Sequence, residues 1–436
     1  MFIGYFTERP YQDPASGYFG ATGKPITDLA MSNGAYDPQL ASNLYDRYLD
    51  EKLYAEEMGF DGLMLNEHHS TPFSMGGVVN VEASILARIT KKPKIVILGN
   101  VIPIWDDPLW LAEQLAIIDM ISHGRLVTGW VRGTARETVA HNMVPPYNFE
   151  RFQEAHDFIV KCWTTPGPFR WEGKHYQYLY VNPWARPYQQ PHPPIWIPGT
   201  VSLNTMRWAA ERRLPYIMLA TDLEATRKSF EVYHEIAAEN GYKSGSQNLG
   251  YLFKVHVDET EELAYETGKK FIQGPSNPFL AGNEGNVTQA IMNLPGFTSR
   301  VAAERLPTAM SAALPAGRAP ATGAEAPAAQ AAPVEPSAVD REAQRRAAYE
   351  KQLETTQIIT GTPKTILPKI RHVLETLRPG SIFFWDGDGA MDHDDSMRSL
   401  RLFGEEVIPA VREMGKELDL YSPYEVDPAT GEKLPG

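Results

Sequence analysis

The stretch KIVILGNVIPIWDDPLWLAEQLAIIDMISHGRLVTGWV, residues 94–131, contains one complete unit of the fold. Two runs, 94–102 and 125–131, are nearly continuous in apolar residues, and a helix-like stretch, 108–122, lies between them. A strand that is buried on both faces has this continuous apolar pattern, whereas a half-exposed strand alternates. The stretch therefore predicts two parallel strands joined by a helix.

The same order of strand and helix recurs along the chain. Counting the apolar runs gives eight strand–helix units, which favours a TIM (β/α)8 barrel over a doubly wound sheet. Catalytic groups of a TIM barrel lie at the C-terminal ends of the strands, so the residues that directly follow the apolar runs are the candidates for chemistry. The expected strands are 2–6, 60–65, 94–102, 125–131, 194–199, 215–220, 249–258 and 381–387, with a Pro- and aromatic-rich loop before the fifth.

The composition is that of a large globular protein. Of the 436 residues, 43% are hydrophobic and 22% are charged, which suffices for a sizeable core. The net charge of −13 argues against non-specific binding to nucleic acid or to an anionic membrane surface. The single cysteine, Cys162, excludes an intrachain disulfide and a multi-cysteine zinc site. Without a signal-peptide pattern or a run of about 18 apolar residues, the sequence predicts a cytoplasmic protein.

One segment interrupts the repeat. From Pro307 to Asp340 more than half of the residues are Ala or Pro, and such a composition buries too little surface to offset the entropy of ordering. We therefore expect a flexible, lid-type insertion at 307–340, before the eighth strand and within a single barrel domain that covers 1–414. Residues 415–436 are expected to form a C-terminal tail.

Two strand ends carry residues suited to an anion. Gly199 ends the fifth strand, and Ser202 and Thr205 follow at the start of a helix. The free N–H groups and the dipole of a helix N-terminus suit a phosphate, although simple N-capping is the commoner role of Ser and Thr. Arg132 directly follows the fourth strand and suits a phosphate or carboxylate; the alternative is a surface arginine paired with Glu137. Together these residues predict one anion site built from neighbouring loops.

The six residues LNEHHS at the end of the second strand include Glu67, His68 and His69. A metal site would need further ligands; MDHDD (391–395) offers candidates, but no series of metal-binding residues follows the strands. Proton transfer is the better interpretation for a histidine, which titrates near neutral pH, and hydrogen bonding of both rings to backbone is the structural alternative. Asn100 lies in a strand, where its amide either contacts a heterocycle or satisfies backbone groups.

Four segments, in order, resemble the luciferase-like flavin monooxygenases: EHHS, GNVIPIWDDPLWLAEQLAIIDMISHGRLVTGWVRG, PIWIPGTVSLNTMRWAAERRLPYIM and TGTPKTILPKI. Bacterial luciferase and the alkane and alkanesulfonate monooxygenases belong to that family, and the resemblance covers about residues 1–275 and 355–414. It implies a TIM barrel that binds reduced FMN, forms a flavin hydroperoxide with O2 and oxygenates a small organic substrate. It also implies a separate NAD(P)H-dependent flavin reductase and a homo-oligomer, either a dimer or a tetramer.

The resemblance further implies roles for particular residues. His68 matches a histidine that acts in proton transfer near the flavin, with Glu67 or His69 orienting it. Asn100 falls at the strand position that lies against the isoalloxazine ring, where a non-proline cis peptide is common, so Gly99–Asn100 or Asn100–Val101 is expected to be cis. The residues matched to the phosphate-binding site are Arg132 and, after Gly199, Ser202 and Thr205.

The chain departs from the family pattern in places. Val131 stands where luciferase has a reactive cysteine, which argues against simple equivalence to luciferase, and the extra arginines of the sulfonate monooxygenases are not recognisable. A deazaflavin-dependent oxidoreductase on the same barrel and a non-catalytic flavin-binding subunit are the alternatives. The sequence does not name the substrate. Pocket candidates, each of which is otherwise a core residue, are Phe73, Trp105, Trp130 and Trp385.

Overall fold

The computed structural model describes residues 1–13, 33–133, 135–200, 202–219, 222–270, 338–427 and 431–434. The predicted lid-type insertion at 307–340 lies outside the described residues, apart from its last positions, which begin helix α12 (Ala338–Glu354). In the described part of the chain, no helix is long and apolar enough to cross a membrane.

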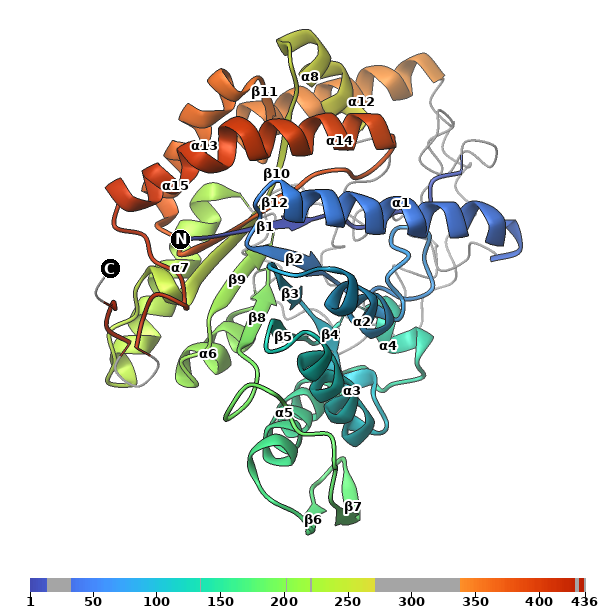
Figure 1. Cartoon of the computed structure of the whole chain (residues 1–436), viewed down its shortest axis with the longest axis vertical. Helices are drawn as coiled ribbons and strands as arrows, with labels where there is room; N and C mark the ends of the chain where they lie inside the picture. Colours follow the sequence, from blue (N-terminus) through green and yellow to red (C-terminus); the bar gives the residue numbers. More distant parts are fainter. Residues whose placement is uncertain are drawn as a thin grey trace, which may run out of the picture.

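Eight parallel strands close into a barrel, as the repeat of apolar runs predicts (Figure 1). The barrel closes where β9 and β10 pair in parallel, with Leu249 opposite Tyr216. Two short strands extend the sheet: β4 (Asn100–Val101) pairs with β5, and β11 (Ile358–Gly361) pairs with β10. The barrel strands are β1 (Phe2–Phe6), β2 (Gly62–Leu65), β3 (Lys94–Ile97), β5 (Leu126–Val131), β8 (Ile195–Gly199), β9 (Tyr216–Leu219), β10 (Leu249–Val257) and β12 (Ser381–Trp385).

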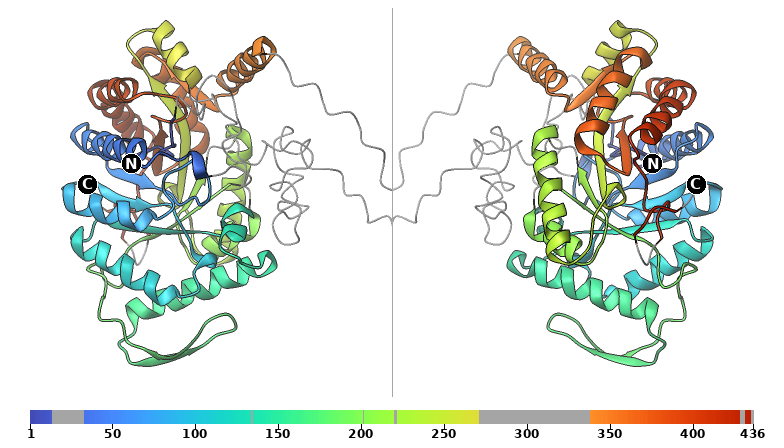
Figure 2. Two further views of the ribbon diagram at one scale, coloured as in Figure 1. Left: turned by 90° about the vertical axis from the view of Figure 1, so that its right-hand side faces the viewer. Right: turned by 90° about the vertical axis from the view of Figure 1, so that its left-hand side faces the viewer.

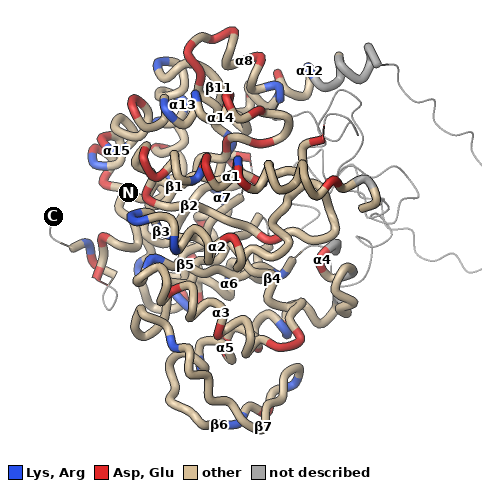
Figure 3. Tube along the Cα trace, turned by 45° about the vertical axis from the view of Figure 1, so that its right-hand side comes forward, with Lys and Arg blue, Asp and Glu red and all other residues tan. Residues whose placement is uncertain are grey.

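Helices surround the barrel, and several of them begin at an aspartate that serves as the N-cap residue. Asp37, Asp107, Asp222 and Asp392 each accept a hydrogen bond from a backbone N–H in the first turn of the following helix. Basic and acidic residues are interspersed along the outer helices (Figure 3). The helices are α1 (Pro38–Glu57), α2 (Val79–Ile89), α3 (Pro108–Ile121), α4 (Ala135–Ala140), α5 (Asn148–Thr164), α6 (Leu203–Glu211), α7 (Leu223–Glu239), α8 (Glu261–Lys269), α13 (Pro363–Leu377), α14 (His393–Leu402) and α15 (Ile408–Glu417).

The core has an inner and an outer layer because strand side chains alternate between the two faces of the sheet. The inner layer fills the barrel with side chains such as Phe6, Met64 and Trp385. The larger outer layer packs the strands against the helices and includes Trp130. Trp130 stacks on Trp163 with ring centroids 6.3 Å apart, so it is a core residue between sheet and helices rather than a pocket residue.

The N-terminal end of the barrel is covered by the C-terminal segment. The N-terminus lies on this side (Figure 1), and the amino group of Met1 is 2.8 Å from a carboxylate oxygen of Glu425. Tyr424 packs against the inner-layer rings of Phe2 and Trp196, with centroids 5.9 and 6.0 Å apart. Helix α15 continues to Glu417, so the first residues of the predicted tail are helical. The segment does not cover the opposite, C-terminal mouth of the barrel, where the catalytic groups are expected.

The segment before β8, predicted as a loop, contains a hairpin. Strands β6 (Phe169–Glu172) and β7 (Gln177–Val181) pair antiparallel and extend away from the barrel below α5 (Figure 2). Tyr178 of this hairpin stacks on Phe158 of α5 with centroids 4.6 Å apart. Its half-exposed strands lack the continuous apolar pattern of the barrel strands, which explains why the sequence did not reveal them.

Candidate active site

His68 lies between two carboxylates at the mouth of the barrel. Its Nδ1 is 3.0 Å from Oε1 of Glu137, which lies on α4, and its Nε2 is 3.8 Å from Oε2 of Glu8, which follows β1. Both carboxylates are nearly buried, whereas the His68 side chain is 21% exposed. Phe73 meets the ring edge-on at 5.6 Å. A histidine held in this way can take up a proton and remain accessible to a ligand.

Glu67 orients His69 rather than His68. Its Oε1 is 2.7 Å from Nε2 of His69, and its Oε2 accepts a hydrogen bond of 2.9 Å from the Val101 N–H. The ring of His69 also meets His141 edge-on at 4.3 Å. The predicted arrangement, with Glu67 or His69 positioning His68, is therefore wrong: the adjacent histidines point to different carboxylates, and Glu137 is the residue that positions His68.

Asn100 is fully buried and belongs to the Glu67 group. Its Nδ2 donates to Oδ1 of Asn80 at 3.1 Å and to Oε2 of Glu67 at 3.3 Å. Its Oδ1 has no hydrogen-bond partner among the described residues. The non-proline cis peptide is Leu98–Gly99, one bond before the earlier of the two predicted positions. A side chain on Gly99 would lie 2.5 Å from the carbonyl oxygen of Gly129, so only glycine allows this close approach of β3 and β5.

Arg132 follows β5 and has no carboxylate partner in the part of the chain that the structure describes. The alternative of a surface pair with Glu137 is wrong, because Glu137 pairs with His68. The guanidinium is partly buried and lies over the ring of Phe149, 5.6 Å from its centroid. Burial lowers the pKa of Arg132, and the nearby Tyr216 opposes that change. An unpaired, partly desolvated cation of this kind is well placed to hold an anionic ligand group.

The N-terminus of α6 follows β8, which pairs with β5, the strand that precedes Arg132. Ser202 is the N-cap residue, and its Oγ is 3.5 Å from the N–H and 3.1 Å from the Oγ1 of Thr205, so the N-capping role is realised, although the first contact is long. Gly199 ends β8, the neighbour of β5 in the barrel. A side chain at Gly199 would lie 2.0 Å from the Tyr216 hydroxyl oxygen. That hydroxyl is buried and has no hydrogen-bond partner among the residues described.

Three further titratable side chains at the mouth were not predicted. Glu8 follows β1, Lys254 lies within β10, and Asp388 follows β12; their exposed fractions are 5, 7 and 4%. By strand alternation Lys254 has the same orientation as Leu252 of the inner layer, and its ammonium lies 4.5 Å from the ring centroid of Trp385. An isolated lysine inside the apolar run LGYLFKVHV is the signal that could have found it.

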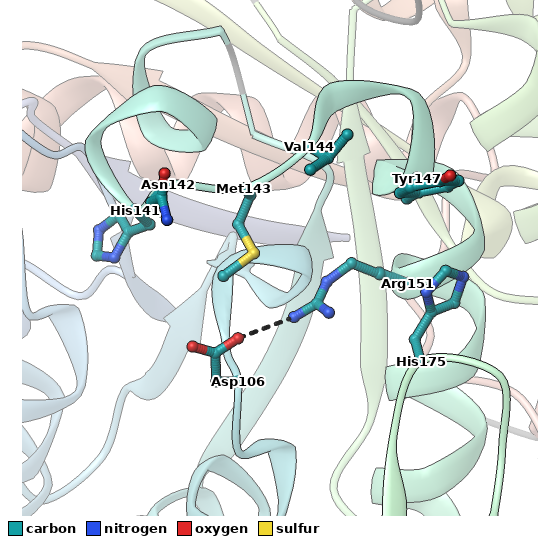
Figure 4. A pocket seen from close by; sticks show the side chains of 8 residues that line it. All are labelled: Asp106, His141, Asn142, Met143, Val144, Tyr147, Arg151 and His175. Carbon is teal, nitrogen blue, oxygen red and sulfur yellow. Dashed lines mark ion pairs between the residues drawn. The ribbon is translucent and has the colours of Figure 1, made fainter.

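A cavity of about 360 Å³ is lined in part by His141 (Figure 4), whose ring contacts the ring of His69. Arg151 points across it to Asp106, 3.5 Å away, and is fixed by hydrogen bonds to the carbonyl oxygens of Pro103 and Trp105. Within the described residues, no group of three or more His, Cys, Asp or Glu side chains is placed to hold a metal ion. The cavity lining consists of Asp106, His141, Asn142, Met143, Val144, Tyr147, Arg151 and His175.

At one mouth of this α/β barrel lie histidine–carboxylate pairs and a candidate anion-binding corner, which consists of Arg132, Gly199 and the N-terminus of α6. The chain belongs to the luciferase-like monooxygenase family, whose model matches residues 30–378. It is 26% identical to the alkanal monooxygenase alpha chain of Photobacterium leiognathi over 253 residues, which is 57% of this chain and 69% of that one. It is 30% identical to the oxygenase component of a flavin-dependent trigonelline monooxygenase from Acinetobacter baylyi over 165 residues, 37% of this chain and 45% of that one.

Solved structures share the barrel. Monooxygenase RslO1 from Streptomyces bottropensis superposes with a TM-score of 0.65 at 18% identity, covering 94% of this chain and 100% of that one. The oxygenating constituent of 3,6-diketocamphane monooxygenase from Pseudomonas putida, in complex with FMN, gives 0.63 at 18% identity, covering 94 and 98%. An F420-dependent secondary alcohol dehydrogenase gives 0.59 at 16% identity, covering 94 and 99%. At these identities the likeness establishes the fold alone.

Proposed function

We propose that this enzyme is an FMN-dependent monooxygenase that uses reduced FMN and O2 to oxygenate a small organic substrate. The observation that carries the proposal is Arg132, a cation with no carboxylate partner among the described residues. It follows β5, whose barrel neighbour β8 leads into α6, and it lies on the same mouth as His68. A phosphate monoester is the ligand group that suits a guanidinium, free helix N–H groups and hydroxyl donors together. Relatives named as flavin-dependent monooxygenases are consistent with it.

The residues present fit the phosphate of FMN. Arg132 would pair with it, and the first N–H groups of α6 and the hydroxyls of Ser202 and Thr205 would donate to it. The Tyr216 hydroxyl, which has no hydrogen-bond partner among the described residues, would be a further donor. Gly199 keeps the corner open, because any side chain there would collide with Tyr216. The Oδ1 of Asn100, which has no hydrogen-bond partner in the part of the chain that the structure describes, would accept from an N–H group of the flavin ring.

Reduced FMN, when bound, supplies the electrons that activate O2. The protein's own part is to orient the flavin by its phosphate, to exclude water and to move protons. His68 would hold a proton at the mouth, with Glu137 fixing the ring through Nδ1. Glu67 and His69 would support the ring-binding wall through Asn100 and Val101.

Anaerobic titration with reduced FMN, followed by mixing with O2, tests this function. We expect saturable binding of reduced FMN and a reoxidation rate that differs from that of free reduced FMN under the same conditions. Oxygen uptake that rises with a candidate substrate, with one oxygen atom appearing in the product, would complete the assignment. Reoxidation at the rate of free flavin, without saturable binding, would exclude it.

A deazaflavin-dependent oxidoreductase is the second candidate, because an F420-dependent alcohol dehydrogenase shares the barrel. Such an enzyme would transfer a hydride and would not consume oxygen. Parallel titrations with reduced FMN and with a reduced deazaflavin separate the two. Tight binding of the deazaflavin alone would favour the second candidate.

A partner that recycles the cofactor follows from the proposed chemistry. We infer a separate NAD(P)H-dependent flavin reductase, consistent with the oxygenase-component relative. Reduced FMN generated by any such reductase should sustain oxygen uptake by this protein, whereas NAD(P)H and oxidised FMN without a reductase should not. Oxygen uptake with NAD(P)H alone would contradict the two-component arrangement.

A second copy of the chain is the other partner that we propose. Helices α2 and α3 pack against each other and expose a shared apolar face, with Ile85 41%, Trp110 62% and Ile117 45% exposed. A large exposed apolar face on a folded chain marks an interaction surface. The alkanal monooxygenase relatives occur as alpha and beta chains that both resemble this one, which favours a copy of itself as the occupant.

The mass in solution tests this association. We expect analytical ultracentrifugation to give a dimer or a multiple of it, and Ile85→Lys combined with Ile117→Lys to give a monomer. Leu179→Lys on the hairpin β6–β7, at a position 81% exposed, is the matched control and should leave the mass unchanged. A monomeric wild-type protein would contradict the proposal.

A further inference from the structure

Four neighbouring strands, in the sheet order β10–β12–β1–β2, each carry or precede a titratable side chain at the mouth. We name these side chains the mouth arc: Lys254, Asp388, Glu8 and His68. Lys254, Asp388 and Glu8 are each at most 7% exposed, so the arc lies in a poorly solvated environment. The anion-binding corner at Arg132 belongs to β5 and the adjoining β8, outside these four strands.

The members of the arc are held by specific contacts. The Trp385 indole N–H donates a hydrogen bond of 2.8 Å to Oδ2 of Asp388, and the ammonium of Lys254 lies over the same indole at 4.5 Å. At the other end, Oε2 of Glu8 is 3.8 Å from Nε2 of His68. Glu8 thus stands between the histidine and the Lys254–Asp388 pair, and its charge acts on both members of that pair.

The carboxyl group of Asp388 is buried among charged neighbours. Burial raises the pKa of its carboxyl group to about 7; Lys254 opposes the rise and Glu8 adds to it. Burial also lowers the pKa of the Lys254 ammonium, and the two carboxylates oppose that change. From α1, the phenol of Tyr48 is electrostatically coupled to Asp388. A carboxyl group that is half protonated at neutral pH can bind a proton and return it.

We propose that Asp388 is the proton reservoir of the active site, electrostatically coupled to His68 through Glu8 and charge-balanced by Lys254. This inference rests on the proposed function. In that reaction reduced FMN, O2 and substrate give FMN, oxygenated substrate and water, so no proton enters from outside. The two hydrogens of the reduced flavin must nevertheless reach the oxygen atom that leaves as water, and a reservoir that accepts a proton and returns it within one turnover meets this need.

A purely structural role for Asp388, as the acceptor for the Trp385 indole, is separable from this one. Asp388→Asn keeps an oxygen acceptor of the same size but cannot titrate. Asp392→Asn is the matched control, since Asp392 follows the same strand, caps α14 and is exposed, and Asn caps a helix equally well.

Infrared difference spectroscopy of the protein without cofactor reads the titration directly. Between pH 6 and 8 we expect a protonated-carboxyl band that disappears as the pH rises, with a midpoint near 7 set by the pKa of Asp388. This band should be absent in Asp388→Asn and retained in Asp392→Asn. Glu8→Gln should lower the midpoint, because it removes a nearby negative charge. Lys254→Met should raise it, because it removes the opposing cation. No carboxyl titration in this range, or one that survives Asp388→Asn, overturns the proposal.

The pH dependence of single-turnover reoxidation gives the functional readout. In the wild-type protein the rate should change across the infrared midpoint, and in Asp388→Asn this inflection should vanish while reduced FMN still binds. An unchanged inflection in Asp388→Asn refutes the reservoir. If reduced FMN does not bind the wild-type protein at all, the proposed function fails, whereas the infrared titration still decides the state of Asp388.

Discussion

Replacing Arg132 by Met removes the cation of the anion-binding corner and keeps an apolar side chain that can still lie on Phe149. Two opposite charges about 4 Å apart interact by roughly 4 kcal/mol at an effective dielectric constant of about 20. Because Arg132 is only partly buried, solvent screening reduces this to about 2 kcal/mol. We therefore expect the dissociation constant for reduced FMN to rise about 30-fold.

Comparison with reduced riboflavin, which lacks the phosphate, makes this prediction specific. Anaerobic fluorescence titration should give tighter binding of FMN than of riboflavin to the wild-type protein, and Arg132→Met should abolish that preference while leaving riboflavin binding nearly unchanged. Arg207→Met, on an exposed part of α6, is the matched control and should bind both flavins as the wild type does. Equal weakening of FMN and riboflavin in Arg132→Met would refute the assignment of the phosphate to this corner.

Further predictions follow from the other contacts of the site and from one buried histidine. Glu137→Gln removes the charge 3.0 Å from Nδ1 of His68 and should slow product formation about tenfold or more in steady-state assays. Gly199→Ala would place a methyl group 2.0 Å from the Tyr216 hydroxyl oxygen, so the free energy of unfolding in urea should fall by about 1–3 kcal/mol. Burial lowers the pKa of His256, but two flanking carboxylates outweigh this effect and raise the pKa from its ordinary 6.5 to about 9. The protonated His256 ring therefore stabilises the folded protein fully below pH 6.5. This contribution is lost as the pH rises through 9. Thermal denaturation from pH 6 to 10 should record that loss.

Each of these predictions has a contradicting result. A Glu137→Gln enzyme with wild-type turnover would remove Glu137 from the site. Gly199→Ala should be partly rescued by adding Tyr216→Phe, which deletes the colliding oxygen, and no rescue would mean that the strain lies elsewhere. For His256→Gln, the melting temperature should vary less with alkaline pH than in the wild type; an unchanged pH dependence would assign the loss to other groups.

The barrel was predictable because its strands are buried on both faces and therefore appear as uninterrupted apolar runs. The hairpin β6–β7 was not, because Leu179 and Tyr180 are exposed and the segment resembles a loop. Helix boundaries were predictable where proline and a capping residue coincide, as at Asp107–Pro108.

The partners within the site were less predictable than its members. Sequence order placed His68, Arg132 and the start of α6 at strand ends, and the fold brings these to one mouth. The pairing of His68 with Glu137 joins residues 69 positions apart, and it depends on where the short helix α4 turns back over the mouth. Adjacent residues such as Glu67 and His68 point in different directions, so proximity in sequence gave the wrong partner. Asp388 escaped notice because a charged residue beside an apolar run has no local signature of its depth. Lys254 was overlooked although it interrupts the apolar run LGYLFKVHV.

A crystal structure of the protein grown with FMN under reducing conditions would locate the phosphate of the bound flavin. We expect the phosphate to contact the Arg132 guanidinium and the N-terminus of α6, with the ring extending over Asn100 toward His68. A phosphate bound instead at Arg151, in the cavity beside His69, would contradict it, as would crystals that exclude flavin at saturating concentration.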